Sequence, residues 1–164
     1  MFDRHVVTTQ FAGRELTLET GELARQASGS VKVTYGGTVI LATAVIEDEP
    51  GSASFLPLRV DFEEKMYAIG QIPGGFFKRE GRPSPEAILI SRSIDRPIRP
   101  LLPGGLRNEV QVICTPLSAE NDSSAEIVAV IGAAAALPLS PAPLEGPFAS
   151  AQVAWLEDEL ILNP

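Results

Sequence analysis

The chain has 164 residues, of which 45% are apolar and 21% charged, a composition typical of a globular domain rather than a disordered chain. No apolar run reaches the ~20 residues of a membrane-spanning helix, and the N-terminal sequence lacks the pattern of a secretory signal. A single cysteine, Cys114, excludes an internal disulfide framework, so we expect a cytoplasmic protein without membrane attachment.

Charge is distributed unevenly along the chain, whose net charge is −8. The segment from Phe76 to Arg107 carries seven basic and three acidic residues, or +4, which leaves −12 for the rest. A cationic segment on an acidic body is typical of a local anion-binding site. The alternative, which charge alone leaves equally open, is that these basic residues pair with acids from elsewhere in the fold.

The N-terminal half predicts β-strands. Gly36-Gly37 separates two runs rich in β-branched residues, which indicates a hairpin whose tight turn needs positive φ. The second run is apolar on both faces, so we expect a central, covered strand. The expected strands are 6–18, as a pair around the turn Ala12-Gly13, then 31–35, 38–46 and 55–62.

Two helices are predicted in the C-terminal half. Ser84 and Pro85 begin the first, as N-cap and first helical residue, and Pro97 should end it near Arg96. The second should run from Ala125 to Leu137 behind a capping box formed by Ser123 and Glu126. Because this helix is apolar all round, we expect it to be buried.

A strand from Glu109 to Thr115 should lie between the helices, with Val110, Val112 and Cys114 facing the core. A hairpin at 153–156 and 160–162 should follow the second helix. The order of elements indicates an α+β (mixed α/β) fold. Since the sequence ends directly after a predicted strand, we expect it to be part of a longer protein.

A glycine-rich loop, Gly70 to Arg82, carries two adjacent aromatic residues and three cations. Aromatic rings stack on unpaired bases at roughly 1–3 kcal/mol per base, while basic side chains hold phosphates. The candidate residues for RNA contact in this loop are Phe76, Phe77, Lys78, Arg79 and Arg82. In the alternative, the two phenylalanines pack into the core, and we expect one of them to do so.

The first helix extends this cationic segment. At ~100° per residue Arg92 and Arg96 lie on one face, and Arg99 continues it if the helix persists. The opposite face should pack against the core through Ala87, Ile90, Ile94 and Ile98. Neighbouring arginines repel each other unless an anion lies among them, and Asp95 can neutralise only one. The alternative is a salt-bridge network with acids elsewhere in the chain.

Other residues give weaker signals for chemistry. His5 is expected to be a strand residue and Cys114 a core thiol. Asp61, Glu63 and Glu64 could form a metal or acid–base cluster, but a solvated strand edge is the simpler interpretation. The sequence has no phosphate-binding P-loop, no zinc spacing and no convincing Ser/His/Asp set. It therefore predicts a surface that holds RNA, with no catalytic residue and no metal site.

Several of these segments resemble the bacterial polynucleotide phosphorylases, specifically their first ribonuclease-PH-like domain. The longest matching segments are Glu19–Ala27, Gly70–Arg82 and Asp95–Leu101. The shorter segments 108–112, 132–137, 146–147 and 162–164 follow in the family's order. The resemblance covers nearly the whole chain.

The resemblance implies a βαβ fold like that of ribosomal protein S5 domain 2, with a mixed sheet packed on helices. It implies that residues 1–164 are the N-terminal ribonuclease-PH-like domain of a longer, multidomain homotrimer. The family degrades single-stranded RNA from its 3′ end with inorganic phosphate and Mg²⁺, in mRNA turnover, and can join RNA-degradation complexes. Its catalytic aspartates and metal belong to a second domain, so this domain should guide RNA without catalysing the reaction.

The resemblance also assigns residues. Phe77, Lys78 and Arg79 match the family's constriction loop, and Arg92, Arg96 and Arg99 match arginines along the RNA path. Lys78 departs from the commoner arginine, which exchanges a planar fork for a point charge. The chain also differs from the family's usual residues at two later places, Leu102 and Ser124–Glu126. Two other functions stay open: a self-sufficient phosphorolytic nuclease, and a ring-assembly module without direct RNA contact.

Overall fold

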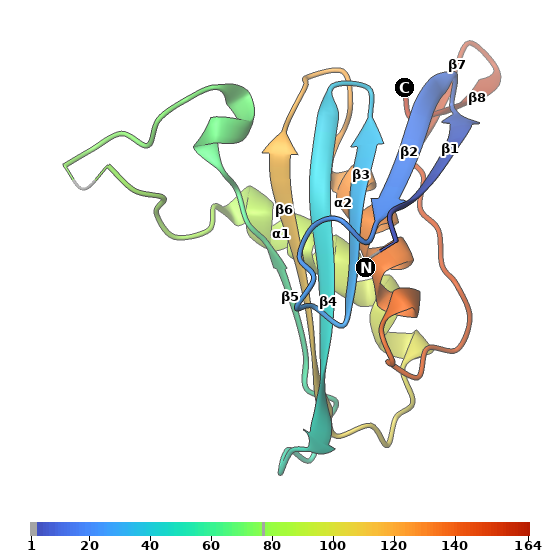
Figure 1. The fold of residues 1–164 in the computed structure, drawn as a ribbon. Coiled ribbons are helices and arrows are strands. Elements are labelled where there is room, and N and C mark those ends of the chain that lie inside the picture. The colour runs from blue at the N-terminus through green and yellow to red at the C-terminus, as the bar shows by residue number, and fades with distance from the viewer. Residues whose placement is uncertain (1–2, 77) are drawn as a thin grey trace.

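Six strands form one mixed sheet in the order β1-β2-β3-β4-β6-β5 (Figure 1). The computed structural model describes residues 3–76 and 78–164. The strands of the sheet are β1 (His5–Phe11), β2 (Arg14–Thr20), β3 (Gly29–Tyr35), β4 (Thr38–Pro50), β5 (Leu58–Phe62) and β6 (Asn108–Ser118). Neighbours in the sheet are antiparallel except β5 and β6, which are parallel.

Two helices cover one face of this sheet. Helix α1 (Pro85–Ile98) connects the parallel strands β5 and β6, and α2 (Ala125–Ala136) follows β6. Both lie behind the sheet in Figure 1. The short 3₁₀ helices are η1 (Met66–Ile69), η2 (Arg99–Leu101) and η3 (Leu137–Leu139), and a separate hairpin comprises β7 (Val153–Leu156) and β8 (Glu159–Leu162). The predicted α+β class is confirmed. Within the described residues, no helix is long and apolar enough to span a bilayer.

The predicted hairpin between β3 and β4 forms around a two-residue turn. Tyr35 faces Thr38 across the turn, and Gly36 has the positive φ, +57°, that the sequence anticipates there. The backbone N–H of Gly37 donates to Glu120 Oε2 at 2.7 Å. The turn is therefore tied to the loop that leads from β6 into α2.

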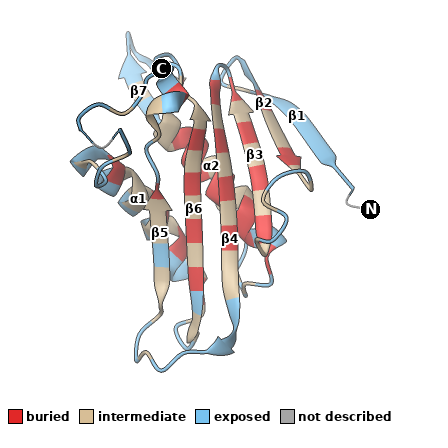
Figure 2. Ribbon diagram, turned by 60° about the vertical axis from the view of Figure 1, so that its left-hand side comes forward, coloured by how far each residue is buried: buried red, intermediate tan, exposed pale blue. Residues whose placement is uncertain are grey.

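The core lies between the sheet and the helices (Figure 2). Alternate residues of the central strand β4, namely Ile40, Ala42 and Ala44, are fully buried under α2. The predicted central position of β4 is confirmed, but full coverage is wrong for its other face. Val39 and Leu41 there are only half-buried, because both helices lie on the opposite side.

Helix α2 packs unusually closely on the sheet because its contact residues are small. A Cβ atom placed on Gly132 would lie 2.9 Å from Ala42 Cβ and 3.2 Å from Val33 Cγ2. The alanines and glycine that make the helix apolar all round also let it approach the strands. The predicted burial of this helix is confirmed, with Val128, Ala129 and Ala133 fully inaccessible.

The predicted end of the first helix near Arg96 is wrong. Helix α1 passes through Pro97 to Ile98 and continues directly into η2. Pro97 cannot donate a backbone hydrogen bond, which is a cost in a helix interior. Ile94 and Ile98 are nevertheless both fully buried, one turn apart. This apolar contact favours helical geometry across the proline.

Two other boundaries differ from the prediction. The capping box is wrong, because the N-cap of α2 is Ser124 and its side chain makes no capping bond. Ser123 instead accepts a hydrogen bond from Arg14 at its hydroxyl and another from Thr38 at its carbonyl. Strand β5 starts at Leu58 rather than at Phe55, since Pro57 has no N–H for a sheet.

Candidate nucleic-acid interface

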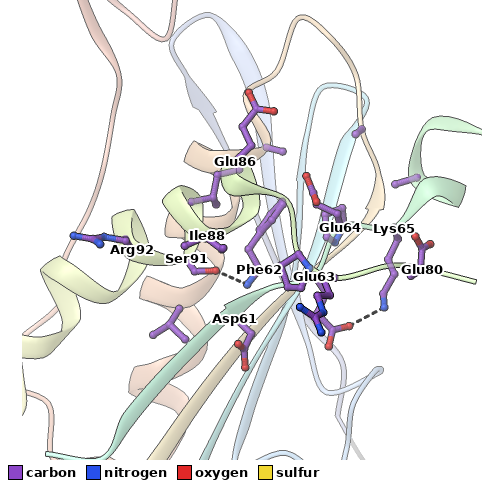
Figure 3. Close-up of a pocket in the computed structure, with 18 of the residues that line it drawn as sticks. Asp61, Phe62, Glu63, Glu64, Lys65, Glu80, Glu86, Ile88, Ser91 and Arg92 are labelled. Atoms are coloured by element: carbon purple, nitrogen blue, oxygen red, sulfur yellow. Dashed lines mark hydrogen bonds and ion pairs between the residues drawn. The ribbon is translucent and has the colours of Figure 1, made fainter. Parts of the chain in front are cut away.

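A groove of about 1110 Å³ lies between β5, α1 and the segment that connects them (Figure 3). Phe62 and Ser91 are among its lining residues, and Ser91 Oγ accepts a hydrogen bond from the Phe62 N–H at 2.9 Å. The same hydroxyl donates to the carbonyl of Ala87 at 2.9 Å. These bonds join the end of β5 to the middle of α1 and hold the two walls of the groove together.

Three acidic residues of the groove are held in ion pairs. Glu63 pairs with Lys65 at 2.9 Å, and this bond raises the pKa of the Lys65 ammonium. Asp61 pairs with Arg59 at 2.7 Å, and Asp95 pairs with Arg99. None of these three carboxylates is available to oppose a bound anion.

Two further carboxylates accept hydrogen bonds from the protein. Glu64 accepts from the N–H and the hydroxyl of Ser84, at 3.2 and 2.8 Å. Glu80 accepts from the N–H of Met66 at 3.0 Å. Sequence reasoning considered Glu64 only as part of an acidic cluster and did not single out Glu80, because carboxylates separated by 16 residues in a loop leave no periodic pattern.

Two of the cations that line the groove have no bonding partner in the described part of the chain, whereas most of its acids do. Arg82 and Arg92 line the groove, and neither makes an ion pair or hydrogen bond within the described part of the chain. Glu86 is the one acidic lining residue that likewise makes no ion pair or hydrogen bond within the described part of the chain. The N–H donors of Arg82 and Arg92 therefore remain available to an anionic ligand, although acidic residues outnumber basic ones in the lining and Glu64, Glu80 and Glu86 keep their charge.

The predicted row of arginines on α1 is divided into two parts. Arg92 and Arg96 are exposed and unpaired among the residues described. Arg99 donates to Asp95 through Nε and Nη2, at 2.9 and 2.6 Å, and this bond raises the pKa of the guanidinium. The arrangement fits the expectation that Asp95 neutralises one arginine and leaves the others free.

The tip of the connecting segment presents its side chains to solvent. Phe76 is 93% exposed, and Lys78 and Arg79 are exposed beside it. Phe76 does not pack into the core, and Phe77 lies outside the described residues, so the expectation that one of the two phenylalanines does so stays a prediction. The tip therefore combines an accessible ring with two accessible cations.

The alternative of a metal or acid–base cluster finds no support in the geometry. Asp61, Glu63 and Glu64 each hold a different protein donor, so they do not form a ligand set for Mg²⁺. Among the described residues, no three His, Cys, Asp or Glu side chains lie close enough to bind a metal ion. Burial raises the pKa of the Cys114 thiol to about 12, which suits the predicted core thiol and not a nucleophile.

Comparison with known proteins gives consistent matches. The sequence model described as "3' exoribonuclease family, domain 1" matches residues 12–143. The polyribonucleotide nucleotidyltransferase of Bacillus subtilis is 52% identical over 162 residues, which cover 99% of this chain and 23% of that protein. The enzyme of the same name from Nitrobacter hamburgensis is 53% identical over 165 residues, again covering 23% of its length. The chain thus spans about a quarter of these relatives.

Solved structures share the fold at low sequence identity. Rice Rrp46 superposes with a TM-score of 0.67 and 20% identity, over 98% of this chain and 68% of that one. A chain of the Archaeoglobus fulgidus exosome, solved with RNA bound to the active site, superposes with a TM-score of 0.66 and 16% identity. The superposition covers 99% of this chain and 66% of that one. The resemblance drawn from the sequence motifs is confirmed by the family match, and the fold by these superpositions.

Proposed function

Because the chain belongs to the 3′ exoribonuclease family, as its first domain, we propose that it is the RNA-guiding, non-catalytic part of a polyribonucleotide nucleotidyltransferase. In this proposal the complete protein is a homotrimer that degrades RNA from the 3′ end. Inorganic phosphate is the co-substrate, nucleoside diphosphates are the products, and mRNA turnover is the process served. A second ribonuclease-PH-like domain would supply the catalytic residues and Mg²⁺.

One observation carries the RNA-guiding role: two guanidinium groups of the groove have no protein partner within the described part of the chain, so their N–H donors can bind a ligand. Arg82 and Arg92 line the groove, and Arg96 continues their surface along α1. Guanidinium groups bind phosphate oxygens through paired N–H donors. Single-stranded RNA presents a phosphate at every nucleotide, so a row of such groups can follow its backbone.

The non-catalytic role is supported by the hydrogen bonds and ion pairs that the carboxylates of the groove make within the protein. Five of them already hold protein donors, as described above, and Ser91 is bonded on both sides. No described residue of the groove combines a free nucleophile with a neighbouring base. The groove can therefore bind and orient a polyanion, but it offers no group to activate phosphate or a phosphodiester.

The experiment is a salt titration of single-stranded RNA binding, comparing the wild type with Arg92→Ala/Arg96→Ala. Each phosphate contact contributes about 0.7 to the slope of log affinity against log salt. The double variant should lower the slope by about 1.4. The double variant Arg25→Ala/Arg107→Ala, which removes the same charge outside the groove lining, should leave the slope nearly unchanged.

The same measurement separates the two other functions. In a ring-assembly module, Arg92→Ala/Arg96→Ala would reduce the oligomer observed by analytical ultracentrifugation and leave RNA affinity unchanged. In a self-sufficient nuclease, the 164-residue chain would release nucleoside diphosphates from RNA with phosphate and Mg²⁺. We expect neither result, and an unchanged salt slope in the arginine variant would refute the RNA-guiding role.

A further inference from the structure

The segment between η1 and α1 projects away from the sheet as an arm, defined here as residues 71–83 (Figure 1). It carries the exposed ring of Phe76 and the cations Lys78, Arg79 and Arg82. The described residues of the arm, 71–76 and 78–83, form no strand or helix. Something else in the structure must therefore fix its direction relative to the arginines of α1.

One connection joins the two ends of the segment. Glu64 lies just before η1 and Ser84 just after the arm, and the carboxylate accepts two hydrogen bonds from Ser84. The Ser84 hydroxyl also accepts the N–H of Ala87 at 3.0 Å, as the N-cap of α1. Glu64 is thereby bonded to the first turn of the helix that carries Arg92.

A second connection lies further out. Glu80 Oε1 accepts the N–H of Met66 at 3.0 Å, which ties the returning half of the arm to η1. Helix η1 is in turn held on the sheet, because the N–H of Ala119, after β6, donates to the carbonyl of Ala68 at 2.9 Å. Glu64 and Glu80 therefore form two successive cross-links at the base of the arm, both anchored to rigid elements.

Electrostatics alone would not favour these two residues beside a polyanion. Both line the groove, and a carboxylate near the RNA backbone weakens binding through like-charge repulsion. Their hydrogen bonds give a physical reason for their presence, since ordering a mobile arm on binding would cost conformational entropy. Removing the carboxylates should raise RNA affinity if charge repulsion dominates, and lower it if their hydrogen bonds order the arm.

We propose that Glu64 and Glu80 are positioning residues, which clamp the base of the arm so that its cations meet the same RNA strand as Arg92. The inference rests on the proposed function for the identity of the ligand. The clamp itself is a property of the free protein. It can therefore be measured without RNA.

The mobility of the arm can be read from a nitroxide label on Gly74→Cys. A Cβ at Gly74 meets no atom within 4 Å, so the label should not disturb the fold. Cys114 is fully buried and should stay unlabelled. The electron paramagnetic resonance spectrum should show faster motion in Glu64→Ala/Glu80→Ala than in the parent. Glu63→Ala/Glu86→Ala, which removes two other groove carboxylates, should leave the spectrum unchanged.

RNA affinity then distinguishes positioning from charge. Glu64→Ala/Glu80→Ala should bind single-stranded RNA about tenfold more weakly, because the arm must be ordered on binding. Glu63→Ala/Glu86→Ala makes the same change in net charge and should bind somewhat more tightly. A circular-dichroism melt of each variant verifies that the fold is intact. A variant that unfolds is replaced by Ser84→Gly, which removes the hydrogen bond from the hydroxyl to Glu64 Oε1 and the capping bond from the Ala87 N–H, and keeps the backbone N–H that donates to Glu64 Oε2.

The possible failures are distinct. Unchanged label mobility in Glu64→Ala/Glu80→Ala, or RNA binding as tight as in the control variant, would overturn the clamp. In either case Arg92→Ala/Arg96→Ala could still flatten the salt slope, and the RNA-guiding role would stand. If the wild type itself bound RNA without salt dependence, the proposed function would fail, whatever the label showed.

Discussion

Arg99 donates two hydrogen bonds to Asp95, one helical turn earlier on α1. The pair spans Pro97, the residue that should have ended the helix, and it exists because the helix continues to Ile98. Of the three arginines in the row, Arg99 is therefore held in an ion pair, and Arg92 and Arg96 remain available to a ligand. An arginine held in this way contributes to a phosphate site only if its carboxylate partner releases it.

Replacing Asp95 with asparagine should make Arg99 available to RNA. The amide keeps the shape of the side chain but removes the charge that holds the guanidinium. We expect the salt slope of RNA binding to increase by up to about 0.7, the contribution of one phosphate contact. The increase should disappear when Arg99→Ala is added. An unchanged slope in Asp95→Asn would indicate that Arg99 lies outside the RNA path.

Removing the ring of Phe76 should weaken RNA binding without affecting the fold. The ring is 93% exposed, so its loss removes little buried apolar surface. Stacking on an unpaired base contributes roughly 1–3 kcal/mol. Phe76→Ala should lose that amount in a fluorescence-anisotropy titration, with the same salt slope as the wild type, and Phe76→Trp should retain it. Equal affinities of the alanine and tryptophan variants would argue against stacking.

The local parts of the fold were predictable because local chemistry determines them. Gly36-Gly37 gave the turn, and the alternation of Val110, Val112 and Cys114 gave the buried face of β6. The boundaries that failed depend on distant contacts. Nothing near Pro97 in the sequence reveals that Ile98 will be fully buried, and nothing near Ser123 reveals that Arg14 will bond to it.

The same distinction holds for the candidate site. Helical spacing predicted that Arg92 and Arg96 share a face, and it predicted that Asp95 could neutralise one neighbour. It could not predict which carboxylates of the groove would be satisfied by the protein. Glu64 and Ser84 are 20 residues apart and meet only because the arm returns to its base. The available charge of the groove is therefore a tertiary property.

Substituting Gly132 with alanine should destabilise the fold. Its Cβ would lie 2.9 Å from Ala42 Cβ, and neither atom can move without shifting its backbone. Overpacking of this kind costs about 1–3 kcal/mol, which exceeds the roughly 1 kcal/mol that alanine gains over glycine in a helix. Urea denaturation should show a lower midpoint with an unchanged m-value. Gly81→Ala, where a Cβ meets no atom within 4 Å, is the matched control and should change little.

The carboxylate of Glu19, on β2, should make stability depend on pH in acid. Glu19 is 8% exposed and forms ion pairs with Lys32 and with Arg4. The hydrogen bond from Lys32, followed by that from Arg4, lowers the pKa of this carboxyl below its ordinary value of 4.5. A depressed folded-state pKa adds stability that is fully present above the unfolded-state pKa. This stability is lost as the pH falls from there through the folded-state pKa.

Glu19→Gln should therefore remove part of the acid sensitivity as well as some stability at neutral pH. At pH 7 the variant should melt at a lower temperature, because its two cationic neighbours lose their charged partner. As the pH falls below about 4.5, the wild type should lose melting temperature faster, so the two melting curves converge. Glu15→Gln, at an exposed position on the same strand, should show the same dependence of melting temperature on pH as the wild type. If the melting temperatures of Glu19→Gln and the wild type differed by the same amount at pH 7 and pH 3, the ion pairs would not be the source of the acid sensitivity.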